Sequence, residues 1–385
     1  MNKVSDILLY HDSFVSLHVQ LHNQLRELIV SGHWHAGNRI PSENQLTSEL
    51  NISRSTVRIA LQRAELEGLV ERIPGKGTFV AHFSHKERQR RLIGFVTCGF
   101  DSETHLLLLN GAEEEIKANG HHIIFTNAQS RQQEIDVLKR FREEGIAGLL
   151  LWPHASASRM QQENSHYYHE LDVPMVLMDR EIYGLECDCV TSENYGGTQA
   201  LMQHLIELGH QHIVFLSHHE TELLTVKERY RAYCDALQDA KLPVINRWLI
   251  GEPGVEIGAT YTLRSSVDVN SPELQQIRNY MLSAAAKPTA IVALNDYLAV
   301  LATQAIRSLD LSIPDAVSIC GFDDIDLAAH LQVPLTTVAQ DSYLIGKHAA
   351  RLLIERLEGY SGPARRDIIS TQLRIRSSTA VPLLV

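Results

Sequence analysis

Beyond residue 91, short apolar runs of strand length alternate with amphipathic stretches of helix length. Strands separated by whole helices cannot pair as hairpins, so this alternation predicts parallel sheets covered by helices. Ligands bind such sheets at the carboxyl ends of the strands. The predicted strands are Leu92–Thr97, His122–Thr126, Gly148–Trp152, Met175–Met178, Ile213–Leu216, Ala290–Ala293 and Ser318–Phe322, and the helices include Leu106–Asn119, Gln132–Glu144, Gly196–Leu208 and Tyr297–Leu309.

The first 80 residues follow a different pattern, one of three helices and a two-stranded ribbon. Leucines at helical spacing mark the first helix. Ser42, with a glutamine three residues later, forms a capping-box pattern that opens the second helix, and Ser53 caps the third. Residues 69–73 and 78–80 are predicted to be short strands, joined by a Pro-Gly-Lys-Gly turn. This order of elements predicts a winged helix-turn-helix.

A polar and mostly basic run, SHKERQRR, separates the two parts at residues 84–91. We expect a DNA-binding domain at 14–82, a linker at 83–91 and a larger domain at 92–385. Residues 1–91 carry 12 Lys and Arg against 9 Asp and Glu, a net charge of +3, and the other 294 residues carry 23 against 37, a net charge of −14. The total of −11 would argue against a nucleic-acid partner. Its distribution instead predicts a small basic module joined to a large acidic one.

The third predicted helix has the two faces that a DNA-reading helix needs, one apolar and one polar. Arg54 and Arg58 are one turn apart on the polar face, so both guanidinium groups can project together. An arginine paired with guanine contributes about 1–3 kcal/mol of base discrimination. The helix N-termini at Ser42 and Ser53 suit phosphate, and Lys76 lies at the tip of the ribbon. An arginine pair alone is more often a solvated helix face, but the whole set favours DNA binding.

This segment closely resembles the DNA-binding domain of the GntR family of bacterial regulators over residues 16–80. The blocks PSE, SRSTVR and GKGTFV carry the resemblance. It implies that the residue after PSE, both arginines of SRSTVR and the GKG wing contact operator DNA. Many relatives have a basic or longer polar residue where this chain has Asn44. The expected DNA-binding residues are Ser42, Asn44, Ser53, Arg54, Ser55, Thr56, Arg58, Lys76 and Gly77.

The rest of the chain is similar to the effector domains of the LacI/GalR family, which share the periplasmic-binding-protein fold. The fusion with a GntR-type reader resembles the arabinose-repressor subgroup. The resemblance implies an α/β fold with two lobes of parallel sheets flanked by helices, and three crossovers near residues 192, 341 and 369. The blocks that carry it include RLIGFV at 91–96, VPMVLMDR at 173–180, KERYRAY at 227–233, AIVALNDYLAV at 290–300 and SICGFDDIDLAAHLQVPLTTVAQD at 318–341.

The same resemblance implies that the lobes enclose a small polar effector, such as a sugar or sugar derivative. A sugar has many hydroxyls and no charge, so its pocket needs multivalent hydrogen-bonding side chains and an aromatic face. Phe322 or Trp152 could stack on the sugar ring. Alternatives stay open: Asp323 could only turn the chain, Arg229 could lie on a helix surface, and Trp152 could pack at a strand end. The expected effector-binding residues are Asp179, Arg180, Arg229, Asn295, Phe322, Asp323 and Gln340.

Other functional classes find little support in the sequence. Five scattered cysteines without a C-x-x-C pair do not predict disulfides or a zinc ribbon, and the helical pair His18 and His22 lacks a further ligand at zinc spacing. No G-x-x-x-x-G-K-[ST], G-x-S-x-G or H-E-x-x-H motif is present, so we expect no enzyme, cofactor or metal. No secretory signal or spanning apolar stretch is found, which predicts a cytoplasmic protein with no membrane partner.

Together these features predict a DNA-binding transcriptional regulator, expected to repress a carbohydrate-utilisation operon and to leave its operator when a sugar-like effector binds. Operators of such readers are usually inverted repeats, so we expect a homodimer. An effector-dependent activator or dual regulator is the alternative. A soluble sugar-binding protein without a regulatory role is a third possibility, against which the DNA module counts.

Overall fold

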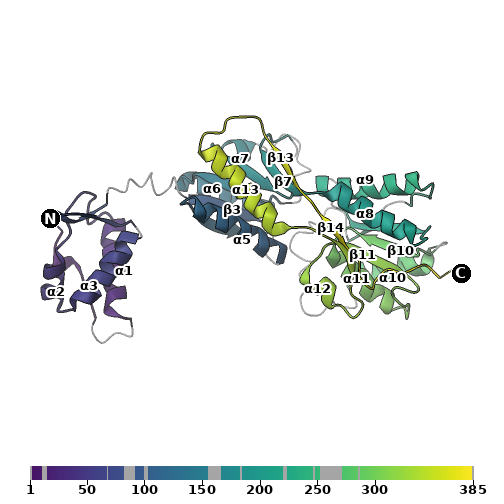
Figure 1. Ribbon diagram of the computed structural model, residues 1–385, viewed down its shortest axis with the longest axis horizontal. Coiled ribbons are helices and arrows are strands. Elements are labelled where there is room, and N and C mark those ends of the chain that lie inside the picture. The colour runs from purple at the N-terminus through teal and green to yellow at the C-terminus, as the bar shows by residue number, and fades with distance from the viewer. Residues whose placement is uncertain are drawn as a thin grey trace. The chain divides into compact units, whose positions relative to one another are not determined.

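The computed structural model describes residues 2–10, 15–66, 68–81, 92–98, 103–154, 166–182, 184–219, 223–245, 248–251, 271–284 and 287–383. The chain forms two units, Met1–Arg90 and Arg91–Val385 (Figure 1). The linker predicted at 83–91 lies outside the described residues. None of the described helices is long and apolar enough to cross a membrane.

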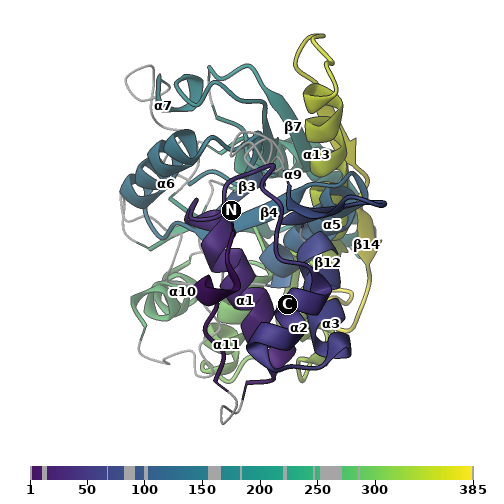
Figure 2. The same ribbon diagram turned by 90° about the vertical axis from the view of Figure 1, so that its left-hand side faces the viewer.

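The small unit is the winged helix-turn-helix predicted from the sequence (Figure 2). Its two strands pair antiparallel, with Val70 opposite Val80. Its core includes buried leucines and valines from all three helices, together with Val4 and Ile7 from a short N-terminal segment that precedes the predicted domain. The elements are η1 (Val4–Asp6), α1 (Leu17–Val30), α2 (Glu43–Leu50), α3 (Arg54–Leu66), β1 (Val70–Ile73) and β2 (Gly77–Val80).

The large unit contains two six-stranded sheets, which define a first and a second lobe (Figure 1). The first lobe contains β3 (Leu92–Thr97), β4 (His122–Asn127), β5 (Gly148–Leu151), β6 (Met175–Met178), β7 (Asp188–Ser192) and β13 (Arg366–Ile369). The second contains β8 (Ile213–His218), β9 (Trp248–Ile250), β10 (Ala290–Ala293), β11 (Ser318–Asp323), β12 (Thr336–Ala339) and β14 (Gln372–Arg374).

The strand orders are β13-β7-β6-β5-β3-β4 and β14-β12-β11-β10-β8-β9. All neighbouring strands pair parallel except β12 and β14. The predicted parallel sheets are therefore confirmed, and all seven predicted strands are present. Strands β7, β9, β12, β13 and β14 were not predicted.

Helices lie between the strands, as the sequence pattern predicts. The chain passes between the lobes after β7, after β12 and after β13, and the crossovers expected near residues 192, 341 and 369 fall in these segments. The helices of the large unit are α5 (Glu103–Ala118), α6 (Arg131–Glu144), α7 (His166–His169), α8 (Asn194–Glu207), α9 (Leu224–Asp239), α10 (Pro272–Ser283), α11 (Asp296–Arg307), α12 (Asp326–His330) and α13 (Ser342–Leu357).

Helix α13 belongs to the first lobe although it follows the second lobe in the sequence, and it lies beside α5 in both views (Figure 1, Figure 2). The two helices approach so closely that only glycine fits at the contact. A Cβ at Gly111 would lie 2.0 Å from the carbonyl oxygen of Tyr343, and one at Gly346 would lie 2.0 Å from that of Leu108. The first lobe is therefore complete only once α13 is in place.

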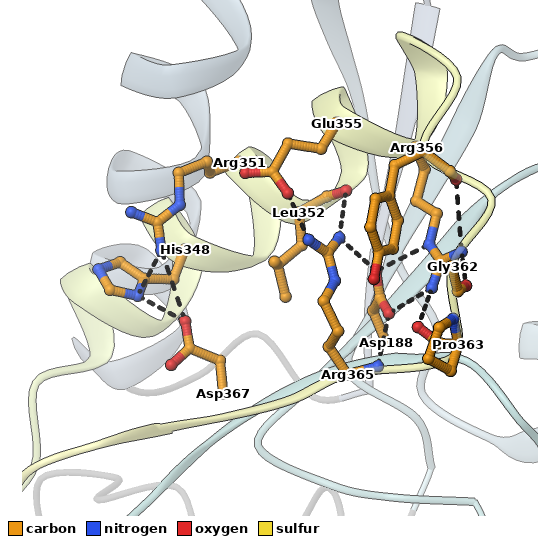
Figure 3. A network of polar contacts seen from close by, with 11 residues as sticks. Asp188, His348, Arg351, Leu352, Glu355, Arg356, Gly362, Pro363, Arg365 and Asp367 are labelled. Atoms are coloured by element: carbon orange, nitrogen blue, oxygen red, sulfur yellow. Dashed lines mark hydrogen bonds and ion pairs between the residues drawn. The ribbon is translucent and has the colours of Figure 1, made fainter.

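A polar network fixes the far end of α13 to the first sheet (Figure 3). The buried carboxylate of Asp188, at the start of β7, accepts from Arg356 at 2.7 and 3.0 Å and from Nη2 of Arg365 at 2.9 Å. Burial alone would raise the pKa of Asp188, but these hydrogen bonds lower it to about 2. The carboxylate therefore stays charged, and it holds the segment between α13 and β13 against β7.

Candidate functional site

The predicted caps of α2 and α3 are confirmed. Oγ of Ser42 accepts from the backbone N–H of Gln45 at 3.3 Å, and Oε1 of Gln45 accepts from the N–H of Ser42 at 2.9 Å. Oγ of Ser53 accepts from the N–H of Thr56 at 3.1 Å and also contacts the hydroxyls of Ser55 and Thr56, each at 2.7 Å. These contacts fix the helix-turn-helix, and most of the capping side chains remain exposed.

The arginines predicted to read DNA are exposed on α3. Arg54 is exposed, and the Arg58 side chain is 69% exposed. Nε of Arg58 donates to Oε2 of Glu43 at 3.0 Å, and Nη2 of Arg72, on β1, lies 3.6 Å from Oε1 of the same glutamate. Glu43 therefore joins α2, α3 and the ribbon, and it orients Arg58. Its role was not predicted from the sequence.

The ribbon tip presents Lys76 to solvent, as predicted. Gly77 beside it has φ of +118°, and a Cβ there would lie 2.8 Å from Nε of Arg39, so glycine is required at this position. Asn44 is exposed on α2. On α3, Ile59 is 48% exposed next to Arg58, where an apolar side chain could meet a thymine methyl group. The sequence interpretation did not include Ile59, although its position on the polar face of the helix already indicated an exposed apolar side chain.

The large unit contains a cavity of about 160 Å³ whose wall comes from both lobes. Its lining follows the carboxyl ends of β3, β5, β6, β8, β10, β11 and β12, the edge at which parallel sheets bind ligands. Six of the seven predicted effector-binding residues line it: Asp179, Arg180, Arg229, Asn295, Asp323 and Gln340. The sequence interpretation did not include His105, His218 and Tyr297, which also line it.

Arg229 lies at the centre of the polar contacts in this cavity. It is 7% exposed, so the alternative of an arginine on the helix surface is wrong. Its Nε donates to Oδ1 of Asn194 at 2.8 Å, and its Nη1 donates to the carbonyl oxygen of Leu294 at 2.7 Å and lies 3.6 Å from Oδ1 of Asp323. Burial lowers the pKa of Arg229, and the neighbouring Asp323 opposes that shift.

Two cavity carboxylates stand on strained backbone. Asp179 has φ of +63° and Asp323 has φ of +117°, in the region that favours glycine. Strained backbone of this kind is common at functional sites.

Nε2 of Gln340 donates to Oδ1 of Asp323 at 3.0 Å, and Oε1 of Gln340 accepts from Ser192 at 2.9 Å. Burial raises the pKa of Asp323 to about 7, against the opposing effect of Arg229. Asn295 caps α11, where its Oδ1 accepts from the N–H of Leu298 at 3.0 Å.

The structure does not bring Phe322 to the cavity wall. The side chain is 2% exposed, and the guanidinium carbon of Arg229 lies over its ring at 3.6 Å from the centroid. Trp152 does line the cavity, but its ring is stacked on His105 at 3.9 Å between centroids, and the guanidinium of Arg180 lies 5.0 Å from its centroid. Protein groups thus already pack on both aromatic rings that were expected to stack on a sugar.

Two contacts join the lobes next to the cavity. Arg366, on β13 of the first lobe, donates to Glu228 of α9 at 2.7 Å and lies 2.7 Å from Glu181 of its own lobe. Oε2 of Glu103, at the start of α5, accepts from the backbone N–H of Asp326 in the second lobe at 3.0 Å. Glu228 directly precedes the cavity residue Arg229, and Glu103 directly precedes the cavity residue Thr104. Both contacts therefore join the lobes beside the cavity, and opening the cleft would break them.

Within the described residues, no group of three or more His, Cys, Asp or Glu side chains could hold a metal ion. All five cysteines are free. The residues that line the cavity instead supply hydrogen-bond donors, acceptors and charges of both signs. This arrangement can bind a small polar molecule from both lobes.

Two family models match the chain. Residues 17–80 match the bacterial regulatory proteins of the gntR family, and residues 202–379 match a periplasmic binding protein-like domain. The arabinose metabolism transcriptional repressor of Geobacillus stearothermophilus is 31% identical over 368 residues, which cover 94% of this chain and 97% of that protein. The repressor of the same name from Halalkalibacterium halodurans is 28% identical over 375 residues, 94% of this chain and 95% of that protein.

Solved structures agree with the fold. A putative ribose operon repressor from Burkholderia thailandensis is 25% identical with a TM-score of 0.62, over 74% of this chain and 99% of that chain. The complex of the regulator CelR with cellobiose has a TM-score of 0.64 at 19% identity, over 88% of this chain and all of that chain. Together with the sequence relatives, this places the chain in the family of bacterial transcriptional repressors that join a GntR-type winged helix-turn-helix to a periplasmic-binding-protein-like domain.

Proposed function

We propose that this chain is a homodimeric repressor of a carbohydrate-utilisation operon and that a monosaccharide or a derivative of one releases it from its operator. The cavity between the lobes is the observation that carries the proposal. Its volume of about 160 Å³ is below the 300–1,000 Å³ of pockets for drug-sized ligands, so it suits one sugar ring better than two. The names of the relatives make arabinose the first candidate and ribose the second.

The chemistry of the lining supports a polyhydroxylated effector. Asp179 and Asp323 accept hydrogen bonds, Arg180 and Arg229 donate them, and the amide of Gln340 is held between Ser192 and Asp323. A sugar hydroxyl both donates and accepts, so it can pair with groups of either kind. Phe322 contributes indirectly in this proposal, because it supports the guanidinium of Arg229.

The effector acts by stabilising the closed lobes. A molecule that contacts both walls binds the closed form better than the open form and so shifts their equilibrium. We propose that the closed form holds the two DNA-binding heads of the dimer in a relative position that fits the operator less well. A 100-fold loss of operator affinity requires a coupling of only about 2.7 kcal/mol, within the usual range for allostery.

The helix α3 reads the operator in this proposal. Arg54 and Arg58 contact base edges, the N-termini at Ser42 and Ser53 contact phosphate, and Lys76 with Gly77 contacts the backbone beside the groove. Asn44, Ser55 and Thr56 complete the contact surface. Since its target is the chromosome, we place the protein in the cytoplasm and assign it no enzyme activity.

The test measures operator binding and sugar binding with the full chain. The promoter fragment upstream of its own operon is titrated with protein by fluorescence anisotropy, without sugar and with arabinose, ribose, xylulose or cellobiose. We expect one pentose to weaken binding about 100-fold and cellobiose to have no effect. Tighter binding with a pentose would make the protein an effector-dependent activator or a dual regulator, and no DNA binding at all would reduce it to a sugar-binding protein.

A further inference from the structure

Buried polar atoms of two residues that line the cavity have no hydrogen-bond partner in the part of the chain that the structure describes. They are Nε1 of Trp152, a donor, and Oδ1 of Asp179, an acceptor. Both residues line the cavity. Buried polar groups are nearly always hydrogen-bonded. An unpaired donor and an unpaired acceptor on residues that line one cavity therefore indicate a partner other than the described residues, and a bound effector would supply it.

The first sheet makes these two residues neighbours. Trp152 directly follows β5 and Asp179 directly follows β6, and the two strands pair in parallel with Leu151 opposite Leu177. Continuing this register by one residue places Trp152 opposite Met178 and Asp179 one position farther along, so both residues lie at the same edge of the sheet, on strands about 4.8 Å apart. A donor beside an acceptor matches a hydroxyl group, which can accept one hydrogen bond and donate another.

The packing around Trp152 leaves its edge as the part that can meet a ligand. The residue is 7% exposed, its ring is stacked on His105 with an angle of 30° between the planes, and Arg180 lies over the ring. These contacts hold the indole in one orientation. The only polar atom of this side chain is the N–H on its edge.

We propose that Trp152 determines effector specificity by donating a hydrogen bond from its indole N–H to one particular hydroxyl of the effector, while Asp179 accepts a hydrogen bond from the same hydroxyl. This inference rests on the proposed function and adds to it a residue that acts through an edge-on hydrogen bond. A sugar that lacks this hydroxyl is rejected, because a buried N–H and a buried carboxylate oxygen are then left unpaired.

The test compares Trp152→Phe with the wild type in the full chain. Phenylalanine keeps an aromatic ring against His105 and removes the donor. Calorimetric titration gives the Kd of arabinose, of ribose and of each of their monodeoxy derivatives for both proteins. For the pentose that binds, we expect the variant to be weaker by about tenfold or more, as for other sites built to hold a hydroxyl. One deoxy sugar alone, the one without the bonded hydroxyl, should bind both proteins within about threefold.

Trp248→Phe is the matched control, because Trp248 stacks on Tyr280 in the second lobe, at 4.1 Å between centroids, and does not line the cavity. It should bind every sugar as the wild type does. Wild-type affinity in Trp152→Phe would overturn the inference, and so would an equal loss for all derivatives, which marks a residue that only shapes the cavity. If neither pentose binds the wild type, the proposed function fails, and the inference fails with it.

Discussion

Replacing Arg229 by methionine removes the central cation of the cavity and keeps most of its apolar bulk. Two acceptors, Oδ1 of Asn194 and the carbonyl oxygen of Leu294, then lose donors at 2.8 and 2.7 Å, and Asp323 loses the charge 3.6 Å from its carboxylate. Breaking a buried ion pair by removing one partner costs about 3–5 kcal/mol. We expect the free energy of unfolding of the large unit to fall by about this amount, and the response to a sugar to be lost.

The size of this loss depends on pH because Asp323 can take up a proton. Burial raises the pKa of Asp323 from its ordinary 3.8 to about 7, so the folded protein binds this proton more tightly than the unfolded chain. The contribution of this group to stability is therefore full below about pH 4, falls as the pH rises to about 7, and is constant above that. Without Arg229 the pKa of Asp323 rises further, so the variant continues to lose stability above pH 7.

Urea unfolding between pH 6 and 9, followed by circular dichroism, measures the difference. Arg231→Met is the control, because Arg231 lies on the same helix with its side chain 76% exposed, where it pairs with Asp235, four residues along, and lies 5.5 Å from the centroid of the Tyr195 ring. It should stay within about 0.5 kcal/mol of the wild type at every pH. The gap between Arg229→Met and the wild type should widen from pH 7 to 9. A variant that matches the wild type at pH 9 would refute the reasoning.

Four further changes test the DNA surface and the fold. Arg58→Ala should weaken operator binding by about 1–3 kcal/mol in an anisotropy titration, and unchanged affinity would remove α3 from the interface. Lys76→Ala should weaken binding to all sequences and lower the salt slope by about one; an identical slope would place the wing away from phosphate. Glu228→Gln removes the inter-lobe partner of Arg366, so small-angle scattering should show a larger radius of gyration at low salt, and an unchanged radius would mean that this contact does not hold the lobes. Gly346→Ala puts a Cβ 2.0 Å from the backbone of α5 and should lower the free energy of unfolding by about 1–3 kcal/mol, whereas a neutral effect would contradict the tight crossing.

The sequence predicted the elements whose own residues carry a strong pattern. Strands β3, β5 and β10 are almost wholly buried and stand out as apolar runs, and Ser42 with Gln45 predicted a cap that the structure contains. The interior strands β7 and β12 are also buried, but their sequences DCVTS and TTVA contain too many polar residues to stand out. Strands β9 and β14 have three residues each, and β13, at a sheet edge, has exposed Arg366 and Ile368, so their apolar signal is weak. They exist because a neighbouring strand supplies hydrogen bonds.

In the candidate site too, features carried by local sequence could be predicted, and contacts between distant residues could not. Motif positions brought six polar residues to one cavity, because five of them end or follow a strand whose carboxyl end faces the cleft and the sixth, Arg229, lies on α9. They could not show that the guanidinium of Arg229 covers Phe322, a contact between residues far apart in the chain. Nor could they show that Glu43 holds Arg58, since the two residues are 15 positions apart and the turn between them brings the two helices together. Contacts of this kind depend on tertiary structure alone.

The late position of α13 in the sequence has a consequence for synthesis on the ribosome. The DNA-binding head has its own hydrophobic core within the first 80 residues, whereas the first lobe needs residues 342–369 to cover α5 and to complete its sheet. Domains fold as units and the N-terminal one folds first. A nascent or truncated chain that ends before Ser342 therefore carries a finished DNA reader and an unfinished effector domain. Premature stop codons in this region should yield products that compete for the operator and ignore the sugar.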